Sequence, residues 1–245
     1  MTTKVGFLTQ VSHMSTSTDP PEPSKLTFQY WTDPMCVWAF VSQSKLDRIL
    51  DKWGDQVEVD YRIVPVFGSV PWRYIEGGWS SAGPEGRREK TRQLAEQHGI
   101  EDVTGDVWVD ADPHSSWACG AAAKAVFGME DDGEAEPGVG ARYLWELRAH
   151  FFRRNRNICH RDEQLAVAER VGVDRAGLEK RLNDGSGLAG LWEDENERDE
   201  AGVRGSPTYV FEGGRAVLYG NFPFSVLRSV VDELVEGLEL GGSGC

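Results

Sequence analysis

Four short segments of the chain carry the apolar pattern of β-strands. Residues 26–31 form an apolar run, and residues 57–64 alternate between apolar and polar positions with a period of two. Residues 208–211 and 216–219 are two further apolar segments, and the turn that joins them contains two glycines, which readily adopt positive φ angles. We therefore predict two separate strands near the N-terminus and a β-hairpin near the C-terminus.

Helical spacing of apolar residues follows the first strand and the hairpin. Residues 36–53 predict a helix, and Gly54 is a suitable residue to end it. A last helix is predicted to begin near Pro223, because proline is tolerated in a first helical turn and the apolar residues between 226 and 235 cover a wide helical face. Each helix can therefore cover a strand that lies next to it in the sequence.

The middle of the chain is predicted to be almost entirely helical. Within it, the acidic segment 128–140, which contains glycines and a proline, is predicted to form a surface loop. The helical candidates are residues 87–98, 116–127, 141–152, 163–171, 175–182 and 188–201.

The order of these elements indicates an α/β fold that is interrupted by helices. Residues 1–25 are rich in Ser, Thr and Pro and are predicted to be a disordered N-terminal segment. Residues 26–83 and 203–240 together form the predicted α/β domain, and residues 84–202 form an all-helical insertion. Met14 is an alternative start of the protein.

The most informative residue is Cys36, which stands where the first strand leads into a helix. The first N–H groups of a helix have no partner within the helix, and the helix dipole is positive there, so this position favours a thiolate. Ala39 occupies the position at which a dithiol enzyme would carry its second cysteine. The pattern therefore predicts a thiol site that lacks an intramolecular resolving cysteine.

Charge and composition exclude several classes of function. Forty acidic residues against 26 basic ones leave a net charge of −14, which argues against nucleic acids and anionic membranes as partners. The chain shows no apolar stretch long enough to span a membrane and no secretory signal, so we predict a cytoplasmic protein. Its four cysteines (36, 119, 159 and 245) have no regular spacing and are expected to be thiols; no metal site is predicted.

Two motifs at opposite ends of the helical insertion resemble those of the DsbA-like thioredoxin superfamily. The first is Asp33-Pro34-Met35-Cys36-Val37-Trp38-Ala39-Phe40, and the second is Val203-Arg204-Gly205-Ser206-Pro207-Thr208-Tyr209-Val210. The superfamily includes DsbA oxidoreductases, FrnE-type dithiol isomerases, 2-hydroxychromene-2-carboxylate isomerases and kappa-class glutathione transferases. The cytoplasmic DsbA/FrnE-type branch is the most similar, and the resemblance extends over residues 26–238. It implies a thioredoxin fold with an all-helical insertion domain.

The resemblance also implies a set of site residues. Cys36 matches the nucleophilic cysteine, and Pro207 matches a cis-proline that faces it. A cis bond at this position would expose the backbone of Ser206 to an extended peptide or to glutathione. Trp38, Ser206, Pro207 and Thr208 are therefore the predicted substrate-binding residues.

Other residues are weaker candidates. Asp33 and His114 are possible modulators of the thiolate, since a carboxylate close to the thiol raises its pKa and a histidine can lower it. Cys119 is interpreted as a small buried residue, with a role as a distal resolving thiol as the alternative. Cys245, on the C-terminal tail, is a more remote candidate for that role.

Three functions remain open at this stage. The first is a monothiol thiol-disulfide oxidoreductase or isomerase that acts on protein thiols or on a small thiol substrate. It would need no cofactor beyond glutathione or another small thiol as co-substrate. The second is a non-catalytic adaptor that binds a protein partner, and the third is a glutathione-dependent isomerase or transferase. The sequence indicates neither the substrate nor the oligomeric state.

The strongly acidic composition predicts adaptation to high salt. Negative charges on the folded surface repel one another, and concentrated salt screens that repulsion. We expect the free energy of unfolding, measured by urea denaturation, to increase between dilute buffer and molar KCl. Full stability in dilute buffer, with no gain on adding KCl, would contradict the prediction.

Overall fold

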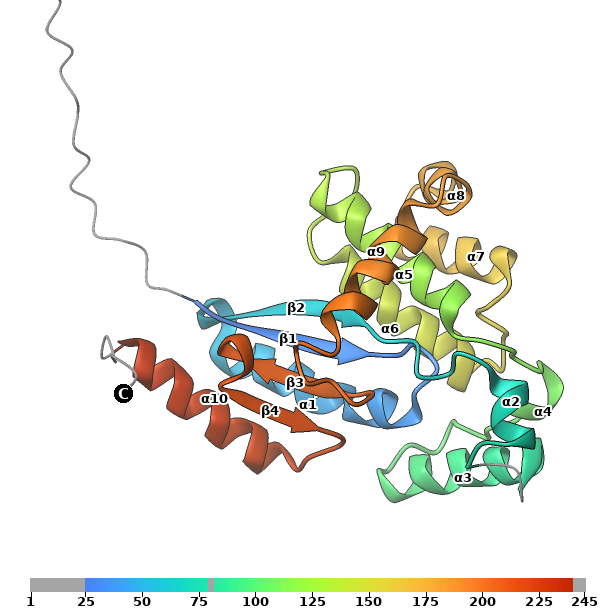
Figure 1. Ribbon diagram of the computed structural model, residues 1–245, viewed down its shortest axis with the longest axis horizontal. Coiled ribbons are helices and arrows are strands. Elements are labelled where there is room, and N and C mark those ends of the chain that lie inside the picture. Colours follow the sequence, from blue (N-terminus) through green and yellow to red (C-terminus); the bar gives the residue numbers. More distant parts are fainter. Residues whose placement is uncertain (1–24, 79–81, 240–245) are drawn as a thin grey trace, which may run out of the picture.

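The computed structural model describes residues 25–78 and 82–239. The predicted disordered segment 1–25 lies outside these ranges, except for its last residue. Cys245 also lies outside them. The described chain forms one mixed sheet with helices around it, in the predicted order of elements (Figure 1).

The sheet has four strands in the order β2-β1-β3-β4. Strand β1 is central and pairs parallel with β2, in register from Leu26 opposite Val57 to Thr32 opposite Ile63. On its other side β1 pairs antiparallel with β3, which forms a hairpin with β4. The strands are β1 (Leu26–Thr32), β2 (Val57–Ile63), β3 (Thr208–Phe211) and β4 (Ala216–Tyr219). The two segments of the predicted α/β domain are thus joined through the hydrogen bonds between β1 and β3.

Two helices cover one face of the sheet. Alternate residues of β1, namely Leu26, Phe28 and Tyr30, point to the same face because successive side chains of a strand alternate. Apolar residues of α1 (Val37–Trp53) and α10 (Phe224–Glu239) form one buried cluster with them. Short 3-10 turns, η1 (Gly54–Gln56) and η2 (Glu212–Gly214), lead from α1 into β2 and from β3 into β4.

The helical block is larger than the sequence pattern predicts. Two short helices, α2 and α4, were not predicted, and helix α5 continues to Asp131, into the segment 128–140 that was predicted to be a loop. Between β2 and β3 the described residues form eight helices: α2 (Val70–Ile75), α3 (Gly83–Gln97), α4 (Val107–Asp110), α5 (Trp117–Asp131), α6 (Val139–Phe152), α7 (Arg161–Val171), α8 (Arg175–Asn183) and α9 (Ser186–Glu197). Helix α2 of this block lies within residues 26–83, the range that the sequence pattern predicts as part of the α/β domain.

A buried carboxylate joins this helical block to the edge of the sheet. Asp194 on α9 is fully buried and accepts a hydrogen bond from the backbone N–H of Ile63 at 2.8 Å. The same carboxylate contacts Arg62 of β2 at 3.1 Å and Lys124 of α5 at 3.0 Å. Three elements therefore converge on one buried negative charge, which two cations and one N–H group compensate.

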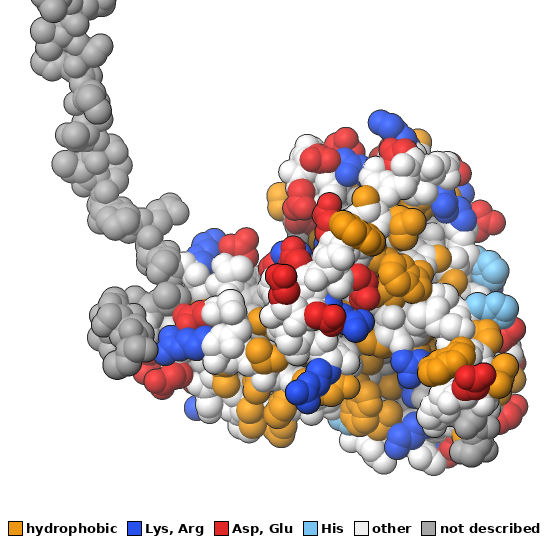
Figure 2. All heavy atoms as spheres, in the orientation of Figure 1, with side chains coloured by type: hydrophobic (Ala, Val, Ile, Leu, Met, Phe, Trp, Pro, Cys, Tyr) orange, Lys and Arg blue, Asp and Glu red, His pale blue; other side chains and the backbone are white. Residues whose placement is uncertain are grey.

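Both signs of charge are spread over the visible surface of the molecule, together with groups of apolar side chains (Figure 2). Within the described ranges, no helix is long and apolar enough to cross a membrane.

We expect replacement of Asp194 by alanine to lower the free energy of unfolding by about 3 kcal/mol, because it leaves a buried N–H group and two cations without their shared acceptor. Urea denaturation measures this change. Glu197→Ala is the matched control, since Glu197 contacts the same Arg62 at 2.9 Å from a half-exposed position. This exposed pair should contribute less than about 1 kcal/mol. Equal effects of the two variants would show that Asp194 has no special structural role.

Candidate active site

Cys36 is the N-cap residue of α1, and the turn before it is built by Asp33. The carboxylate of Asp33 accepts a hydrogen bond from the N–H of Met35 at 2.7 Å, and its carbonyl accepts one from the N–H of Cys36 at 3.1 Å. Aspartate favours such turns because its short side chain can bond the backbone two residues further on. Strand β1 and this turn together place the cysteine at the start of the helix.

The loop before β3 contacts the cysteine directly. The Cys36 Sγ donates to the carbonyl of Ser206 at 3.2 Å, and the Ser206 hydroxyl accepts from the N–H of Asp33 at 2.9 Å. The Ser206–Pro207 peptide bond is cis. Gly205 allows the close approach of Tyr219, because a Cβ at position 205 would lie 3.1 Å from the Tyr219 ring. The two sequence motifs thus meet in space, with Cys36 and Ser206 in contact.

Asp33 connects four segments of the chain. Besides the N–H of Met35, its carboxylate accepts from the hydroxyl of Ser116 at 2.6 Å and from the N–H of Phe67 at 3.3 Å, while the N–H of Asp33 itself donates to Ser206. The residue is fully buried, and burial raises the pKa of Asp33 to about 6, although the hydrogen bonds from Ser116, Met35 and Phe67 oppose the shift. The carboxyl group of Asp33, with a pKa close to neutrality, is therefore part of the surroundings of the Cys36 thiol.

The protonation state of Cys36 differs from the expectation based on its position in the helix. Burial raises the pKa of the Cys36 thiol above its ordinary value, because only 4% of the residue is exposed. Hydrogen bonds from the Ser206 side chain and from the N–H of Ala39 lower the pKa, as does the charge of Arg87, whereas Asp33 raises it. The helix terminus acts in the predicted direction, but burial is the largest effect. The resting cysteine is therefore a neutral thiol that donates to Ser206.

Arg87, on α3, is a charged residue near the site that the sequence pattern did not single out. Its guanidinium lies over the ring of Trp108 at 5.0 Å and over the ring of Phe67 at 5.6 Å. Burial lowers the pKa of Arg87 to about 10 and the charge of a Cys36 thiolate opposes this shift, so the residue stays cationic at neutral pH. Arg87 therefore favours negative charge at Cys36. No motif marks it, because neighbouring arginines in α3 have the same local pattern.

A groove of about 240 Å³ lies next to the Ser206 loop, lined by Trp38, Ser206, Tyr219, Gly220 and Asn221. Trp38 and Tyr219 are 39% and 53% exposed, so both rings present apolar surface to solvent. Sequence reasoning identified Trp38 and Ser206 but missed the other three residues. Only the β3–β4 hairpin brings these three residues to the site.

The base of the groove is fixed by polar contacts. The rings of His98 and Trp38 are nearly perpendicular, with 6.0 Å between ring centroids, and the His98 Nε2 lies 2.9 Å from the amide nitrogen of Asn221. The amide oxygen of Asn221 accepts from Ser42 at 2.8 Å and from Lys45. These contacts hold the Asn221 side chain in a defined position beside the groove.

The remaining predicted residues lie in different surroundings. Thr208 is fully buried, and its hydroxyl donates to the carbonyl of Gly205 at 2.7 Å, so it shapes the loop before β3 from the inside. His114 is exposed, and its Nε2 lies 3.2 Å from a carboxylate oxygen of Asp112. Its role as a thiolate modulator stays a prediction. Cys119 is buried, in line with its interpretation as a core residue.

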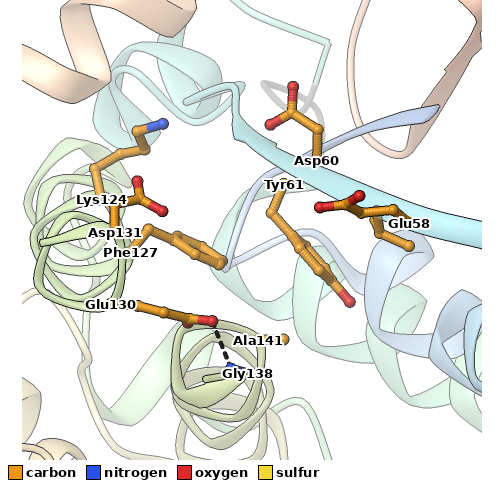
Figure 3. A pocket seen from close by; sticks show the side chains of 10 residues that line it. Glu58, Asp60, Tyr61, Lys124, Phe127, Glu130, Asp131, Gly138 and Ala141 are labelled. Carbon is orange, nitrogen blue, oxygen red and sulfur yellow. Dashed lines mark hydrogen bonds between the residues drawn. The ribbon is translucent and has the colours of Figure 1, made fainter. Parts of the chain in front are cut away.

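A larger pocket, of about 410 Å³, lies elsewhere, along the free edge of β2 (Figure 3). Tyr61 of β2 stacks on Phe127 of α5 there, with 5.5 Å between ring centroids, and Glu130 accepts from the N–H of Gly138. None of the predicted site residues lines it. We therefore locate the candidate active site at the smaller groove, which has a thiol beside it.

The raised pKa of Asp33 predicts a pH dependence of stability. A group whose pKa is about 6 when folded and 3.8 when unfolded stabilises the fold fully below pH 3.8 and loses this contribution as the pH rises through 6. Between about pH 4 and pH 7 the free energy of unfolding of the unmodified protein should fall by about 2 kcal/mol more than that of Asp33→Asn. Urea denaturation at several pH values measures the difference.

The control for this measurement is Asp131→Asn, which removes an exposed carboxyl group and should leave the pH profile unchanged. Parallel profiles for the unmodified protein and Asp33→Asn would contradict the assignment of a raised pKa to Asp33.

Comparisons with known proteins agree with this fold. The DSBA-like thioredoxin domain family matches residues 27–232, whereas a search of curated protein sequences finds no match. The solved structures that are similar include three whose sequences are at most 20% identical. A probable DsbA oxidoreductase from Streptomyces coelicolor is 17% identical, covering 86% of this chain and 90% of that one, with a TM-score of 0.67. The cytosolic disulfide reductase DsbM from Pseudomonas aeruginosa is 20% identical, covering 85% of this chain and 100% of that one, with a TM-score of 0.61.

DsbM is also known in a structure with GSH, at a TM-score of 0.60. A 2-hydroxychromene-2-carboxylate isomerase is 14% identical, covering 89% of this chain and 100% of that one, with a TM-score of 0.61. The predicted fold class, a thioredoxin fold with a helical insertion, is confirmed. The resemblance to the DsbA-like thioredoxin superfamily is confirmed as well, and the chain belongs to the DsbA-like thioredoxin domain family.

Proposed function

We propose that this protein is a monothiol thiol-disulfide oxidoreductase or isomerase that acts through Cys36 and uses a small thiol such as glutathione as co-substrate. The observation that carries the proposal is the contact between Cys36 Sγ and the Ser206 carbonyl at 3.2 Å, at a cis Ser206–Pro207 bond and beside an open groove. A thiol, the loop before β3 and space for a substrate are thus brought together.

In the first half-reaction Cys36 attacks one sulfur of a substrate disulfide. A bond forms between Cys36 and that sulfur, the substrate S–S bond breaks, and the released thiolate takes up the proton that Cys36 gives up. Arg87 and the N–H of Ala39 favour the transient negative charge on Cys36, whereas an ionised Asp33 opposes it. Since the resting thiol is protonated, the reaction needs a base or a leaving thiolate to accept its proton.

In the second half-reaction a thiol from outside the active site resolves the mixed disulfide. Ala39 is fully buried and carries no sulfur, so it cannot attack. A small thiol attacks the substrate sulfur, Cys36 regains its proton, and a new disulfide between the small thiol and the substrate leaves. If the attacking thiol belongs to the substrate itself, the same step isomerises the substrate disulfide. The net change is one thiol–disulfide exchange.

The groove suits a peptide-like thiol. An extended peptide can pair with the backbone at Ser206, while Trp38 and Tyr219 provide apolar walls of the groove that Ser206 lines. The structure of the similar DsbM with GSH supports glutathione as a ligand of this chain. DsbM is a cytosolic protein, which supports a cytoplasmic location for this protein as well. Protein thiols are the other substrate class that the proposal includes.

A non-catalytic adaptor is the second candidate. The observations that favour it are the low exposure of Cys36, the raised pKa of its thiol and the loss of the second cysteine at Ala39. In that case the groove between Trp38 and Tyr219 would bind a protein partner without thiol exchange. Activity measurements on Cys36 distinguish the two candidates.

We expect Cys36→Ser to lower the rate at which the protein reduces a glutathionylated peptide, in the presence of glutathione, by at least about 100-fold. The rate is followed by release of the peptide thiol, and mass spectrometry of the acid-quenched reaction should find the mixed disulfide on Cys36. Cys245→Ser is the matched control and should retain the full rate. Equal rates for all three proteins would end the proposal and leave the adaptor as the better candidate.

The variant Ala39→Cys provides a second arm of the same experiment. It adds a thiol one helical turn after Cys36, at the position whose N–H hydrogen-bonds to Cys36. The mixed disulfide on Cys36 should then be released intramolecularly, so its lifetime should shorten by at least about 10-fold. An unchanged lifetime of the mixed disulfide would show that a thiol at residue 39 cannot reach the Cys36 sulfur. In that case the absence of a cysteine at position 39 would not be the reason why an external thiol is needed.

A further inference from the structure

Two other cysteines, 40 positions apart in the sequence, meet in the helical block. Cys119 lies in the first turn of α5, and Cys159 lies just before α7. Cys119 Sγ is 3.3 Å from the carbonyl oxygen of Ser116, and Cys159 Sγ is 2.8 Å from that of Ser115. The two thiols are close enough for each to change the pKa of the other. Neighbouring carbonyls thus hold two thiols side by side.

The two thiols differ in accessibility and in acidity. Cys119 is fully buried, and burial raises the pKa of its thiol. Cys159 is partly exposed, and the hydrogen bond from Cys119 lowers the pKa of Cys159. The pair therefore combines an accessible thiol that ionises more easily with a buried thiol that keeps its proton. This is the asymmetry expected of an attacking and a resolving thiol.

A groove of about 380 Å³ leads to Cys159. Its walls are mainly apolar and come from α5, α7, α8 and α9; its lining includes Trp117, Leu182, Leu188 and Arg161. Apolar side chains gather on the surface where α5 and α9 lie (Figure 2). Leu188 of α9 is 54% exposed. A small disulfide can approach Cys159 from this side, without entering the groove beside Cys36.

The pair also lies close to the residues that support the candidate active site. Cys159 Sγ is 3.8 Å from the Sδ of Met35, the residue that precedes Cys36. Ser116, whose carbonyl contacts Cys119, donates its hydroxyl proton to Asp33. The two thiol sites are thus joined through Met35 and Ser116. Exchange at Cys159 does not require Cys119 to act as a resolving thiol for Cys36.

We propose that Cys119 and Cys159 are a second dithiol–disulfide couple, which exchanges reversibly with low-molecular-weight disulfides. The Cys159 thiolate attacks a small disulfide, forming a mixed disulfide and releasing one small thiol. Cys119 then attacks the Cys159 sulfur, gives up its proton and releases the second small thiol. Two protein thiols are oxidised to one disulfide, and one small disulfide is reduced to two thiols. This couple does not depend on turnover at Cys36.

The test uses the full-length double variant Cys36→Ser/Cys245→Ser, which keeps Cys119 and Cys159 as its only cysteines. The folded protein is equilibrated with mixtures of reduced and oxidised glutathione, quenched with acid, and alkylated after unfolding. Mass spectrometry should show both alkylations lost together as the mixture becomes more oxidising, and regained when reduced glutathione is restored. Peptide mapping should identify a crosslink between Cys119 and Cys159 in this variant and in the unmodified protein.

Two variants sharpen the result. In the same background, Cys119→Ala should stop at a stable glutathione adduct on Cys159, whereas Cys159→Ala should leave Cys119 alkylatable after oxidation. The proposal is wrong if both thiols of the folded double variant stay alkylatable under oxidising conditions, or if Cys159 holds glutathione although Cys119 is present. Cys36 is absent from this background. A negative result in this experiment would therefore leave the proposed function at Cys36 unaffected. Likewise, a negative result in the Cys36→Ser assay would leave the Cys119–Cys159 couple unaffected.

Discussion

The carboxylate of Asp33 is the interaction on which the candidate site depends. It is buried, and it accepts hydrogen bonds from the turn before α1, from the segment after β2 and from the start of α5. The backbone N–H of the same residue binds the hydroxyl of Ser206. Residues that are far apart in the sequence are thereby held around Cys36. Burial of a carboxyl group is costly unless its lone pairs are satisfied, and these donors satisfy them.

The same arrangement opposes the charge that thiol chemistry requires. A helix N-terminus and the nearby Arg87 favour a thiolate at Cys36, but burial and the carboxylate of Asp33 favour the thiol. Burial is the larger effect, so the resting thiol is neutral. Protonation of Asp33, whose pKa is about 6, would remove one of the two opposing effects. The reactivity of the thiol therefore depends on the proton held by a neighbouring carboxyl group as well as on the helix.

The helical block contributes to the site and does more than cover the sheet. Met35 and Cys36 belong to the same apolar cluster as residues of α5, α6 and α7, so the cysteine is packed into the helical core from one side. Ser116 and Arg87, which come from this block, place a hydroxyl and a cation near Asp33 and Cys36. Asp194 fixes the other end of the block to β2. Two buried carboxylates thus hold the inserted helices against the thioredoxin-like sheet.

Much of the fold could be predicted because local patterns suffice for its regular elements. Residues 208–211 and 216–219 are strands as predicted, and α1 differs from its predicted range only at the first residue. Helices α2 and α4 were missed because each has fewer than two turns, too short for a helical period to show. Helix α5 was ended too early because Gly128 and the acidic residues after it look like a loop. There the packed helical block overrides weak local propensity.

The site divides in the same way. The sequence by itself determined that Cys36 begins a helix after a strand, that residue 39 has no thiol, and that a Ser-Pro pair precedes the hairpin. Only the tertiary structure decided that Cys36 is buried and protonated, that Asp33 joins four segments, that the charge of Arg87 acts on the thiol, and that Tyr219 and Asn221 line the groove with Ser206. It also brought Cys119 and Cys159 together. The physical reason is that burial, pKa and contact between distant residues depend on the packing of several elements, whereas strand and helix patterns depend on neighbours in the chain.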